Sequence, residues 1–508
     1  MGHLRTPDFL VMAAYAIGML AIGWWYSRRQ DSTEEYFVAG RGISSTIAGI
    51  SIIATLLSSI SYLATPGEVI KNGPGWIYSI FHAPISFLVV GYLMIPFLKA
   101  EKVTSGYTLL EKRLGKGIRR MSSGVFVLSR LFWMGLVVYT CSFAVVTITG
   151  LPLRPVLIGV GLIGTLYTVW GGIRAVMITD IIQFAILVGG LVVTIVFIAI
   201  RCGGFSVLWP DMESSAIQSL NWPKIRIFSL NPFDRMTAFS VILYVSLFWI
   251  CTATSDQVVI QRFLCTRDVR SARRSFGLTV FFDAVLNMLM VLTGLALLHY
   301  FLEYPQNLPI PNESIPSQAD RLFPHFIAAI FPTGITGLVI AALFAAAMSS
   351  LDSGISSIST VLVTDFPHIF LRGANQEESR KLRRARFLAL ATGLAAISMS
   401  LIITIVPGKN LLEMTIRISS LFTGPLFVLF AMAFYLRSST PAGAWAALIV
   451  GFLTGLTMTY WEAISGALWG KPDDFSVLLI MPTAITVSIL IGILVSHFTR
   501  PCDQGERG

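Results

Sequence analysis

Residues 49–70 read GISIIATLLSSISYLATPGEVI, a stretch apolar enough to lie inside a bilayer. Ser58, Ser59 and Ser61 interrupt its centre, and Pro66-Gly67 follows about one and a half helical turns later. In hydrocarbon, each freed backbone carbonyl is costly unless it is buried in protein or faces a polar cavity. The stretch therefore predicts a broken membrane helix that lines a cavity.

A second stretch of the same kind covers residues 240–264, SVILYVSLFWICTATSDQVVIQRFL. Thr252, Thr254, Ser255 and Asp256 interrupt its apolar run at a comparable depth. Paired interruptions in two halves of a chain are typical of inverted-repeat transporters, whose binding sites lie at the membrane midplane beside the unwound segments. The alternative is a pair of Ser/Thr-rich helices whose hydroxyls bond back to their own carbonyls.

The composition places both stretches in a polytopic membrane protein. Of 508 residues, 55% are hydrophobic and only 13% are charged, too few to cover a soluble globule of this length. Thirteen apolar stretches, give or take one, are long enough to cross a bilayer as helices. They are 8–26, 44–70, 76–98, 121–150, 155–170, 176–200, 235–261, 275–302, 334–363, 387–406, 411–436, 441–463 and 475–498.

These stretches predict an all-α fold with a single transmembrane transporter domain over residues 1–508. Spans two to six form one half and spans seven to eleven the other, and five spans per half make the halves opposite in orientation. The expected division is a leading helix at 8–26, a first repeat at 44–200, a second repeat at 235–436 and two trailing helices within 441–498.

Basic residues predict the orientation, because Lys and Arg accumulate in cytoplasmic loops. With the N-terminus outside and the C-terminus inside, most of the 37 Lys and Arg fall in inner loops, among them the loop RFLCTRDVRSARR. The positive charge of the inner loops is explained by membrane topology and by contact with lipid headgroups. We expect no soluble surface that could bind nucleic acid. A short tail and compact loops favour a bacterial inner membrane.

Cysteine spacing and catalytic motifs argue against several other classes. The five cysteines show no paired or metal-type spacing, so neither a disulfide nor a zinc site is predicted. The sequence contains no nucleotide-binding glycine loop and no catalytic Ser/His/Asp arrangement, which disfavours an ATP-driven pump or an enzyme. A carrier and a channel both stay compatible with the sequence.

Residues 345–357, AAAMSSLDSGISS, put five serines and an aspartate into an apolar span. In a helix, Ser349, Asp352, Ser353 and Ser356 share one face. Hydroxyls together with the carbonyls of an unwound segment suit a hard cation such as Na⁺. Serines that pack helices together are the alternative, but that alternative does not account for Asp352.

Three further carboxylates lie within or beside expected spans. Asp180 could be a second cation ligand or a structural partner of Arg174, and intramembrane carboxylates are usually functional. Asp283 could pair with an arginine of the loop before its span. Glu68, after Pro66-Gly67, could gate or cap the outer mouth.

Four motifs together resemble the sodium:solute symporter family: YFVAGR at 36–41, VWGGIRAVMITDIIQF at 169–184, DQVVIQRFL at 256–264 and FAAAMSSLDS at 344–353. The resemblance covers nearly the whole chain. It implies the LeuT-type fold, which has two five-helix inverted repeats with one helix before them and two after. It also implies Na⁺ as the coupling ion.

The resemblance further implies a main Na⁺ site. Its ligands would be the carbonyls of Ala54, Leu57 and Ala346 and the hydroxyls of Ser349 and Ser350. Some members of the family bind a second Na⁺, at positions that match Asp180, Ser349, Asp352 and Ser353. Asp352 replaces a Ser or Thr there. The extra carboxylate either strengthens the second Na⁺ site, or these positions do not form that site in this chain.

The substrate class is predicted from the same resemblance. Sugar carriers use polar contacts where this chain has Leu56, Ile60 and Ser61 on the first broken helix and Trp249 on the other, and unpaired sugar hydroxyls would cost roughly 1–3 kcal/mol each. The stretch SSISYLATPGEV is more similar to the iodide, monocarboxylate and vitamin branch. Arg130 and Arg417 could each pair a carboxylate, snorkel or balance an aspartate. The expected cavity residues are Leu56, Ser58, Ser61, Trp249, Thr252 and Ala253.

The sequence thus favours Na⁺-coupled symport of a small organic anion, first of all a monocarboxylate, by alternating access across a lipid bilayer. A sugar or amino-acid symporter and a proton-coupled carrier using Asp180 or Asp352 are the alternatives among carriers. From another class, a channel or a non-transporting solute sensor is the rival. A channel requires a continuous polar stripe on several helices, which the sequence does not show.

Overall fold

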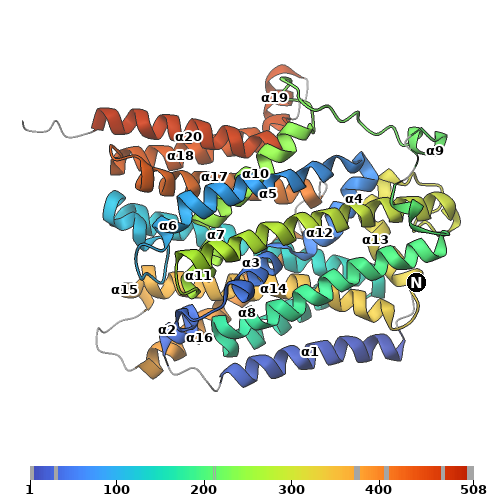
Figure 1. Cartoon of the computed structure of the whole chain (residues 1–508), viewed down its shortest axis with the longest axis horizontal. Coiled ribbons are helices and arrows are strands. Elements are labelled where there is room, and N and C mark those ends of the chain that lie inside the picture. The colour runs from blue at the N-terminus through green and yellow to red at the C-terminus, as the bar shows by residue number, and fades with distance from the viewer. Residues whose placement is uncertain are drawn as a thin grey trace, which may run out of the picture.

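The computed structural model describes residues 5–27, 32–209, 211, 213–370, 378–404, 411–470 and 475–499. The regular elements in these residues are helices, and β pairing is limited to two isolated bridges. Figure 1 shows the long helices running side by side along one common direction. One end of the molecule carries α2 and α15, at the left of Figure 1, and the other carries α13, at the right; these are called the α2 end and the α13 end.

The helices of the first part of the chain are α1 (Thr6–Ser27), α2 (Thr33–Val38), η1 (Ala39–Arg41), α3 (Ser45–Leu56), α4 (Ser59–Asn72), η2 (Pro74–Phe81), α5 (His82–Leu88), η3 (Val89–Met94), α6 (Ile95–Leu98), α7 (Thr108–Thr149), α8 (Leu153–Arg201), η4 (Phe205–Leu208) and α9 (Ser215–Gln218). Those of the second part are α10 (Ala238–Ser255), α11 (Gln257–Cys265), α12 (Val269–Glu303), η5 (Pro305–Asn307), η6 (Pro316–Gln318), α13 (Ala319–Ala329), α14 (Ile335–Asp365), α15 (Pro367–Phe370), α16 (Glu378–Ile403), α17 (Leu411–Tyr435), α18 (Pro441–Thr459), α19 (Trp461–Trp469) and α20 (Val477–Thr499).

In the described part of the chain, eleven helices are long and apolar enough to cross a membrane, and the bent pair α3 and α4 makes a twelfth span. The expected stretch 155–170 corresponds to the apolar helix Leu153–Leu166, which is shorter than the others. It is continuous with the next span in α8, across a kink at Gly172 where φ is 60°. The last two positions of the expected stretch 387–406 lie outside the described residues.

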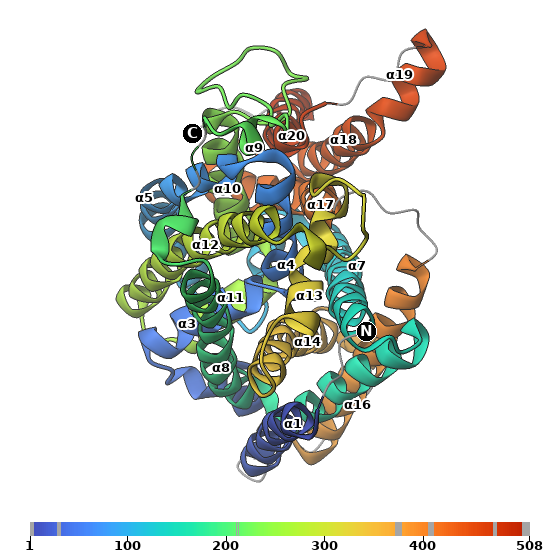
Figure 2. The ribbon, with the colours of Figure 1, turned by 90° about the vertical axis from the view of Figure 1, so that its right-hand side faces the viewer.

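Helix α14 is the central helix of the bundle. In its most apolar window 83% of residues are buried, compared with 17% for α1. Figure 2 looks along the helices and shows α3, α4, α11 and α14 inside, with α1 and α16 at one edge and α18 and α20 at another. The serine cluster of α14 is therefore in the protein interior and not at the lipid surface.

Candidate functional site

The first broken helix has its break at Leu57 and Ser58. Both residues are extended, with ψ of 98° and 171°, and the axes of α3 and α4 differ by 61°. The Ser58 hydroxyl accepts a hydrogen bond from the amide of Ile60 at 3.2 Å and so caps the new helix. Extended residues interrupt the helical ladder, which leaves carbonyls of the last turn of α3 available to other partners.

Two serines of α14 take up those carbonyls. The Ser349 hydroxyl donates to the carbonyl oxygen of Ala54 at 2.8 Å and lies 3.2 Å from that of Ala346. The Ser350 hydroxyl donates to the carbonyl oxygen of Thr55 at 2.6 Å. The structure thus brings together Ala54, Ala346, Ser349 and Ser350 of the predicted Na⁺ ligands.

Leu57, the fifth predicted ligand, lies at the same break and lines the neighbouring cavity. Sequence reasoning missed the Thr55 carbonyl, although it lies in the last turn of α3 between Ala54 and the break. The buried interface of α3 and α14 thus contains three backbone carbonyls and two hydroxyls that lie close together. Neutral oxygen ligands of this kind fit Na⁺, which must be released in each cycle.

The second broken helix has its break at Asp256, between α10 and α11. Asp256 is extended, and its carboxylate accepts from the amide of Val258 at 2.8 Å, as the Ser58 hydroxyl does for Ile60 at the first break. On the other side, the Asp256 carboxylate lies 3.5 Å from Nη1 of Arg130 on α7. The two breaks therefore begin their second helices in the same way.

Asp180 lies at the first break and pairs with Arg262 of α11. Both side chains are fully buried, and Nη2 of Arg262 lies 3.1 Å from Oδ2 of Asp180. The same Oδ2 accepts from the Ser51 hydroxyl at 2.5 Å and from the Thr55 hydroxyl at 3.4 Å. Arg262 also donates to the hydroxyls of Ser51, Thr55 and Ser353 at 2.6, 2.7 and 2.5 Å.

Arg174 is not the partner of Asp180, so that alternative is wrong. Its guanidinium lies 3.2 Å from Glu35 of α2 and donates to the carbonyl of Ala39, because the kink at Gly172 places it at the α2 end. Asp352, also fully buried, accepts from the Ser353 hydroxyl at 3.3 Å. The predicted Asp180, Asp352 and Ser353 are thus close together.

Two adjoining cavities lie beside the breaks. The larger, of about 90 Å³, includes Leu56, Ser61 and Trp249 of the expected substrate residues, and the smaller, of about 30 Å³, includes Leu56, Arg130 and Thr252. Leu56, Trp133, Phe248 and Ser419 line both cavities. Ser58 and Ala253 are buried at the breaks without lining either cavity, and Arg417 lines a separate pocket, where it donates to the carbonyl of Thr459.

The smaller cavity has buried donors with no partner. Among the described residues, Nε and Nη2 of Arg130 and the indole Nε1 of Trp133 make no hydrogen bond. Burying an unpaired donor is costly, so such groups in a binding cavity call for a ligand that accepts from them. A carboxylate, which can accept from two nitrogens of one guanidinium, has the required chemistry.

The larger cavity carries an acidic group on its opposite side. Oδ2 of Asp283 on α12 lies 2.8 Å from Nε2 of His82 and accepts from the indole of Trp249 at 3.2 Å. The expected pairing of Asp283 with an arginine of the preceding loop is wrong, because Asp283 faces the interior. His82 was missed by sequence reasoning, although a histidine in the middle of an apolar span was a usable signal.

Comparisons with known proteins identify the family of the chain. The sequence profile of the sodium:solute symporter family matches residues 36–451. The chain is 25% identical over 472 residues to sodium-coupled monocarboxylate transporter 2 of Homo sapiens, covering 92% of this chain and 73% of that protein. It is 26% identical over 476 residues to the sodium/sialic acid symporter SiaT of Proteus mirabilis (strain HI4320), covering 93% of each.

A solved structure gives the same result for the fold. It shows a Na⁺-coupled sialic acid symporter in a substrate-bound outward-open state, with a TM-score of 0.83 and 24% identity over 99% of this chain and 100% of that chain. The predicted LeuT-type fold is confirmed. The chain belongs to the sodium:solute symporter family, as a multi-pass membrane carrier whose coupling ion is Na⁺.

Proposed function

We propose that this chain moves a small organic anion, first of all a monocarboxylate, together with Na⁺ by alternating access. The observation that supports an anionic solute is the buried guanidinium of Arg130 beside a cavity, two of whose nitrogens have no hydrogen-bond partner among the described residues. The indole of Trp133 adds a third donor at the same place. The monocarboxylate transporter among the relatives supports this choice of substrate.

The coupling ion is proposed to bind where α14 meets the break between α3 and α4. Ala54, Thr55 and Ala346 would supply carbonyls, with the hydroxyls of Ser349 and Ser350 turning from these carbonyls to the ion. Leu57, at the break, remains a predicted ligand. Each Na⁺ that moves inward gains about 2.3 kcal/mol per 100 mV of membrane potential, in addition to its concentration gradient. A monoanion that moves with it loses the same amount, so a cycle of one Na⁺ and one monoanion is driven by the Na⁺ concentration gradient alone.

The ion is proposed to control access by joining the two repeats. Na⁺ bound at Ser349 and Ser350 would order the break on the α3 side, and the solute would then bind in the cavities next to Leu56. When α14 separates from α3, the oxygen cage opens and both leave together. The solute cavities and the ion cage share the same break, so that one ligand would strengthen the binding of the other.

A second candidate follows from Asp283. A carboxylate with an amino or hydroxyl group could bind Arg130 with one end and donate to Asp283 with the other, so an amino acid is the alternative substrate. The proposed cell location is a bacterial inner membrane, with the N-terminus outside and the C-terminus in the cytoplasm. The relatives named above are transporters, and we propose no catalytic activity.

Uptake into proteoliposomes tests the proposal. Labelled monocarboxylates, amino acids and sugars are compared with and without an inward Na⁺ gradient, for the wild type and for Ser349→Ala. The matched control is Ser359→Ala, because the Ser359 hydroxyl bonds within its own helix, to Ile355 at 2.6 Å. Na⁺-dependent accumulation of a monocarboxylate, lost in Ser349→Ala and kept in Ser359→Ala, is the expected result.

Other outcomes are equally informative. Equal accumulation in choline buffer would refute Na⁺ coupling at this site and favour protons. Equilibration without accumulation would indicate a channel. Selective accumulation of a sugar would refute the proposal that the solute is an anion, without contradicting the proposed Na⁺ site.

A further inference from the structure

Two of the side chains expected to hold a second Na⁺, Asp180 and Ser353, already contact a cation of the protein itself. Arg262 is fully buried, and its Nη2 lies within 3.1 Å of Asp180, Thr55 and Ser353. Its Nε donates to Ser51, and its Nη1 donates to the carbonyl of Val258 at 2.9 Å. The five donor positions of the guanidinium are therefore largely used inside this cluster.

The guanidinium uses two of the oxygens that a second Na⁺ ion would need. Oδ2 of Asp180 accepts three hydrogen bonds, one of them from Arg262, and the Ser353 hydroxyl contacts the guanidinium at 2.5 Å. Arginine stays protonated in proteins, so this positive charge is permanent. A Na⁺ ion beside it would be repelled, and it would find Oδ2 of Asp180 and the Ser353 hydroxyl already in use. Among the described residues Oδ1 of Asp180 makes no hydrogen bond, so the repulsion by the guanidinium is what excludes the ion.

We propose that Arg262 takes the place of a second Na⁺, so that the carrier couples one Na⁺ to each solute. The inference rests on the proposed function, because it assumes the Na⁺ site at Ser349 and Ser350. For a monoanion, one Na⁺ makes the cycle electroneutral. Asp180 and Ser353 are then positioning residues for Arg262 and not ion ligands.

Equilibrium binding of ²²Na⁺ to the purified protein tests the number of ions. The wild type is expected to bind one Na⁺ per chain, Ser350→Ala to lose affinity by at least tenfold, and Ser353→Ala to keep affinity within about twofold. These two variants remove the same hydroxyl from the same helix, less than one turn apart. Arg262→Gln, if it folds, is expected to gain a second Na⁺ at the freed Asp180, and the double variant with Asp180→Asn to lose it again.

The outcomes separate the inference from the proposed function. A wild type that binds no Na⁺ refutes the proposed function and this inference with it. Two Na⁺ per wild-type chain, or a loss of affinity in Ser353→Ala equal to that in Ser350→Ala, refutes this inference alone. A second readout is uptake of a monocarboxylate under a valinomycin-imposed K⁺ potential, which is expected to be unchanged and would be stimulated if two Na⁺ moved.

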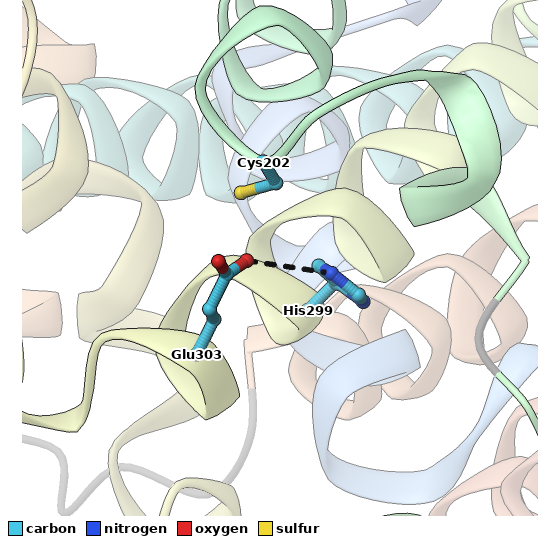
Figure 3. Close-up of side chains that lie close together, drawn as sticks. All are labelled: Cys202, His299 and Glu303. Carbon is cyan, nitrogen blue, oxygen red and sulfur yellow. Dashed lines mark ion pairs between the residues drawn. The ribbon is translucent and has the colours of Figure 1, made fainter.

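An independent observation concerns the α13 end, where three metal-ligating side chains meet. Figure 3 shows Cys202, at the end of α8, facing His299 and Glu303 on α12. The Sγ, imidazole nitrogen and carboxylate oxygen lie within 4.8 Å of one another, and Nε2 of His299 is 3.6 Å from Oε2 of Glu303. His299 and Glu303 are four residues apart on one face of the helix.

This set matches the ligands of zinc. Sulfur, imidazole nitrogen and carboxylate oxygen are the three donors that Zn²⁺ takes from proteins, and in a tetrahedral shell they lie about 3.3–3.8 Å apart. The Glu303 side chain is 44% exposed and can rotate to close the remaining gap. We infer a Zn²⁺ site at Cys202, His299 and Glu303, with water as the fourth ligand, that joins the ends of α8 and α12.

The prediction of no zinc site rested on sequence spacing, which could not detect ligands about a hundred residues apart. Calorimetric titration of the detergent-purified chain with Zn²⁺ tests the site without any transport assay. One Zn²⁺ per chain is expected, with affinity lowered at least tenfold in Cys202→Ser and in His299→Gln. His325→Gln, a histidine near the same end outside the cluster, serves as the control. Binding that is absent, or unchanged in both cluster variants, would overturn the assignment.

Discussion

The hydroxyl of Ser350 lies 2.6 Å from the carbonyl oxygen of Thr55, and this contact joins the central helix α14 to the break between α3 and α4. The same contact brings two of the proposed Na⁺ ligands together. Because the hydroxyl can donate to the carbonyl without an ion and would turn to the proposed ion when it binds, the pair can hold α3 and α14 together in two ways.

Ser350→Ala is expected to raise the Na⁺ concentration needed for half-maximal uptake by at least tenfold. The variant removes one ion ligand and leaves the Thr55 carbonyl buried without its donor, which costs about 1–3 kcal/mol. Uptake measured over a range of Na⁺ concentrations gives the shift. Ser359→Ala, on the same helix, should behave as the wild type, and an equal shift in both variants would argue against the ion site.

Arg130→Gln is expected to lower kcat/KM for carboxylates by roughly tenfold to a hundredfold, because charge-assisted hydrogen bonds are worth about 1.5–3 kcal/mol. Arg130→Lys should recover only part of the lost kcat/KM, since lysine cannot offer two coplanar donors. Competition assays with a carboxylate and its uncharged amide measure the discrimination directly. If both variants distinguish the two ligands as the wild type does, Arg130 does not contact the anion.

Gly354→Ala is expected to reduce transport through a clash with Met134, one helical turn from Arg130 on α7. A Cβ at position 354 would overlap Sδ of Met134 and lie 3.5 Å from Nε of Arg130, so either the Met134 side chain or helix α7 would have to shift beside Arg130. Overpacking of this kind costs about 1–3 kcal/mol. Met134→Ala in the same chain should relieve the clash, and thermal unfolding together with uptake would show whether it does. Full activity of Gly354→Ala without the second substitution would contradict the close packing of Gly354 against Met134.

Glu68→Gln is expected to destabilise the α13 end. Arg235 contacts Glu68 at 2.5 and 2.9 Å and Glu413 of α17 at 3.1 Å, and the Glu68 side chain is almost fully buried. Breaking a buried ion pair costs about 3–5 kcal/mol, and less here because Arg235 is partly exposed and keeps Glu413. The melting temperature in detergent should fall by several degrees. Glu101→Gln, at an exposed ion pair with Lys112, is the control that should change little.

The sequence was sufficient to predict both breaks from the serine, threonine and aspartate side chains that interrupt two apolar spans, although the similar cluster of α14 lies in an unbroken helix. The resemblance to the family, and not the residue pattern alone, implied that Ser349 and Ser350 lie beside Ala54, and the structure places Ser349 in contact with Ala54 and Ser350 in contact with Thr55. The sequence did not predict Arg262 correctly, since arginines near span ends are ordinarily loop charges and this one was grouped with an inner loop. The chain folds Arg262 inward because the break at Asp256 redirects α11 toward Asp180.

Contacts between helices account for the other differences. The pairing of His82 with Asp283 joins residues about two hundred positions apart, and nothing in the local pattern of either span identifies its partner. The carbonyl of Thr55 has no sequence signature, because every residue carries one. Side-chain chemistry was therefore predictable along each helix, whereas the choice of partner depended on the packing of the bundle.

The two breaks also differ in their electrostatics. The start of a helix carries a partial positive charge from its free amides, and its end carries a partial negative charge. The negative end of α3 faces the serines of α14, which suits a cation. At the start of α11 the carboxylate of Asp256 offsets the positive end, whereas the start of α4 is capped by the neutral Ser58. An anion in the cavities next to Leu56 and Leu57 would therefore be attracted to the start of α4, and Na⁺ to the end of α3. The backbone of the break alone would thus direct the cation and the anion to different sides, independently of the side chains that bind them.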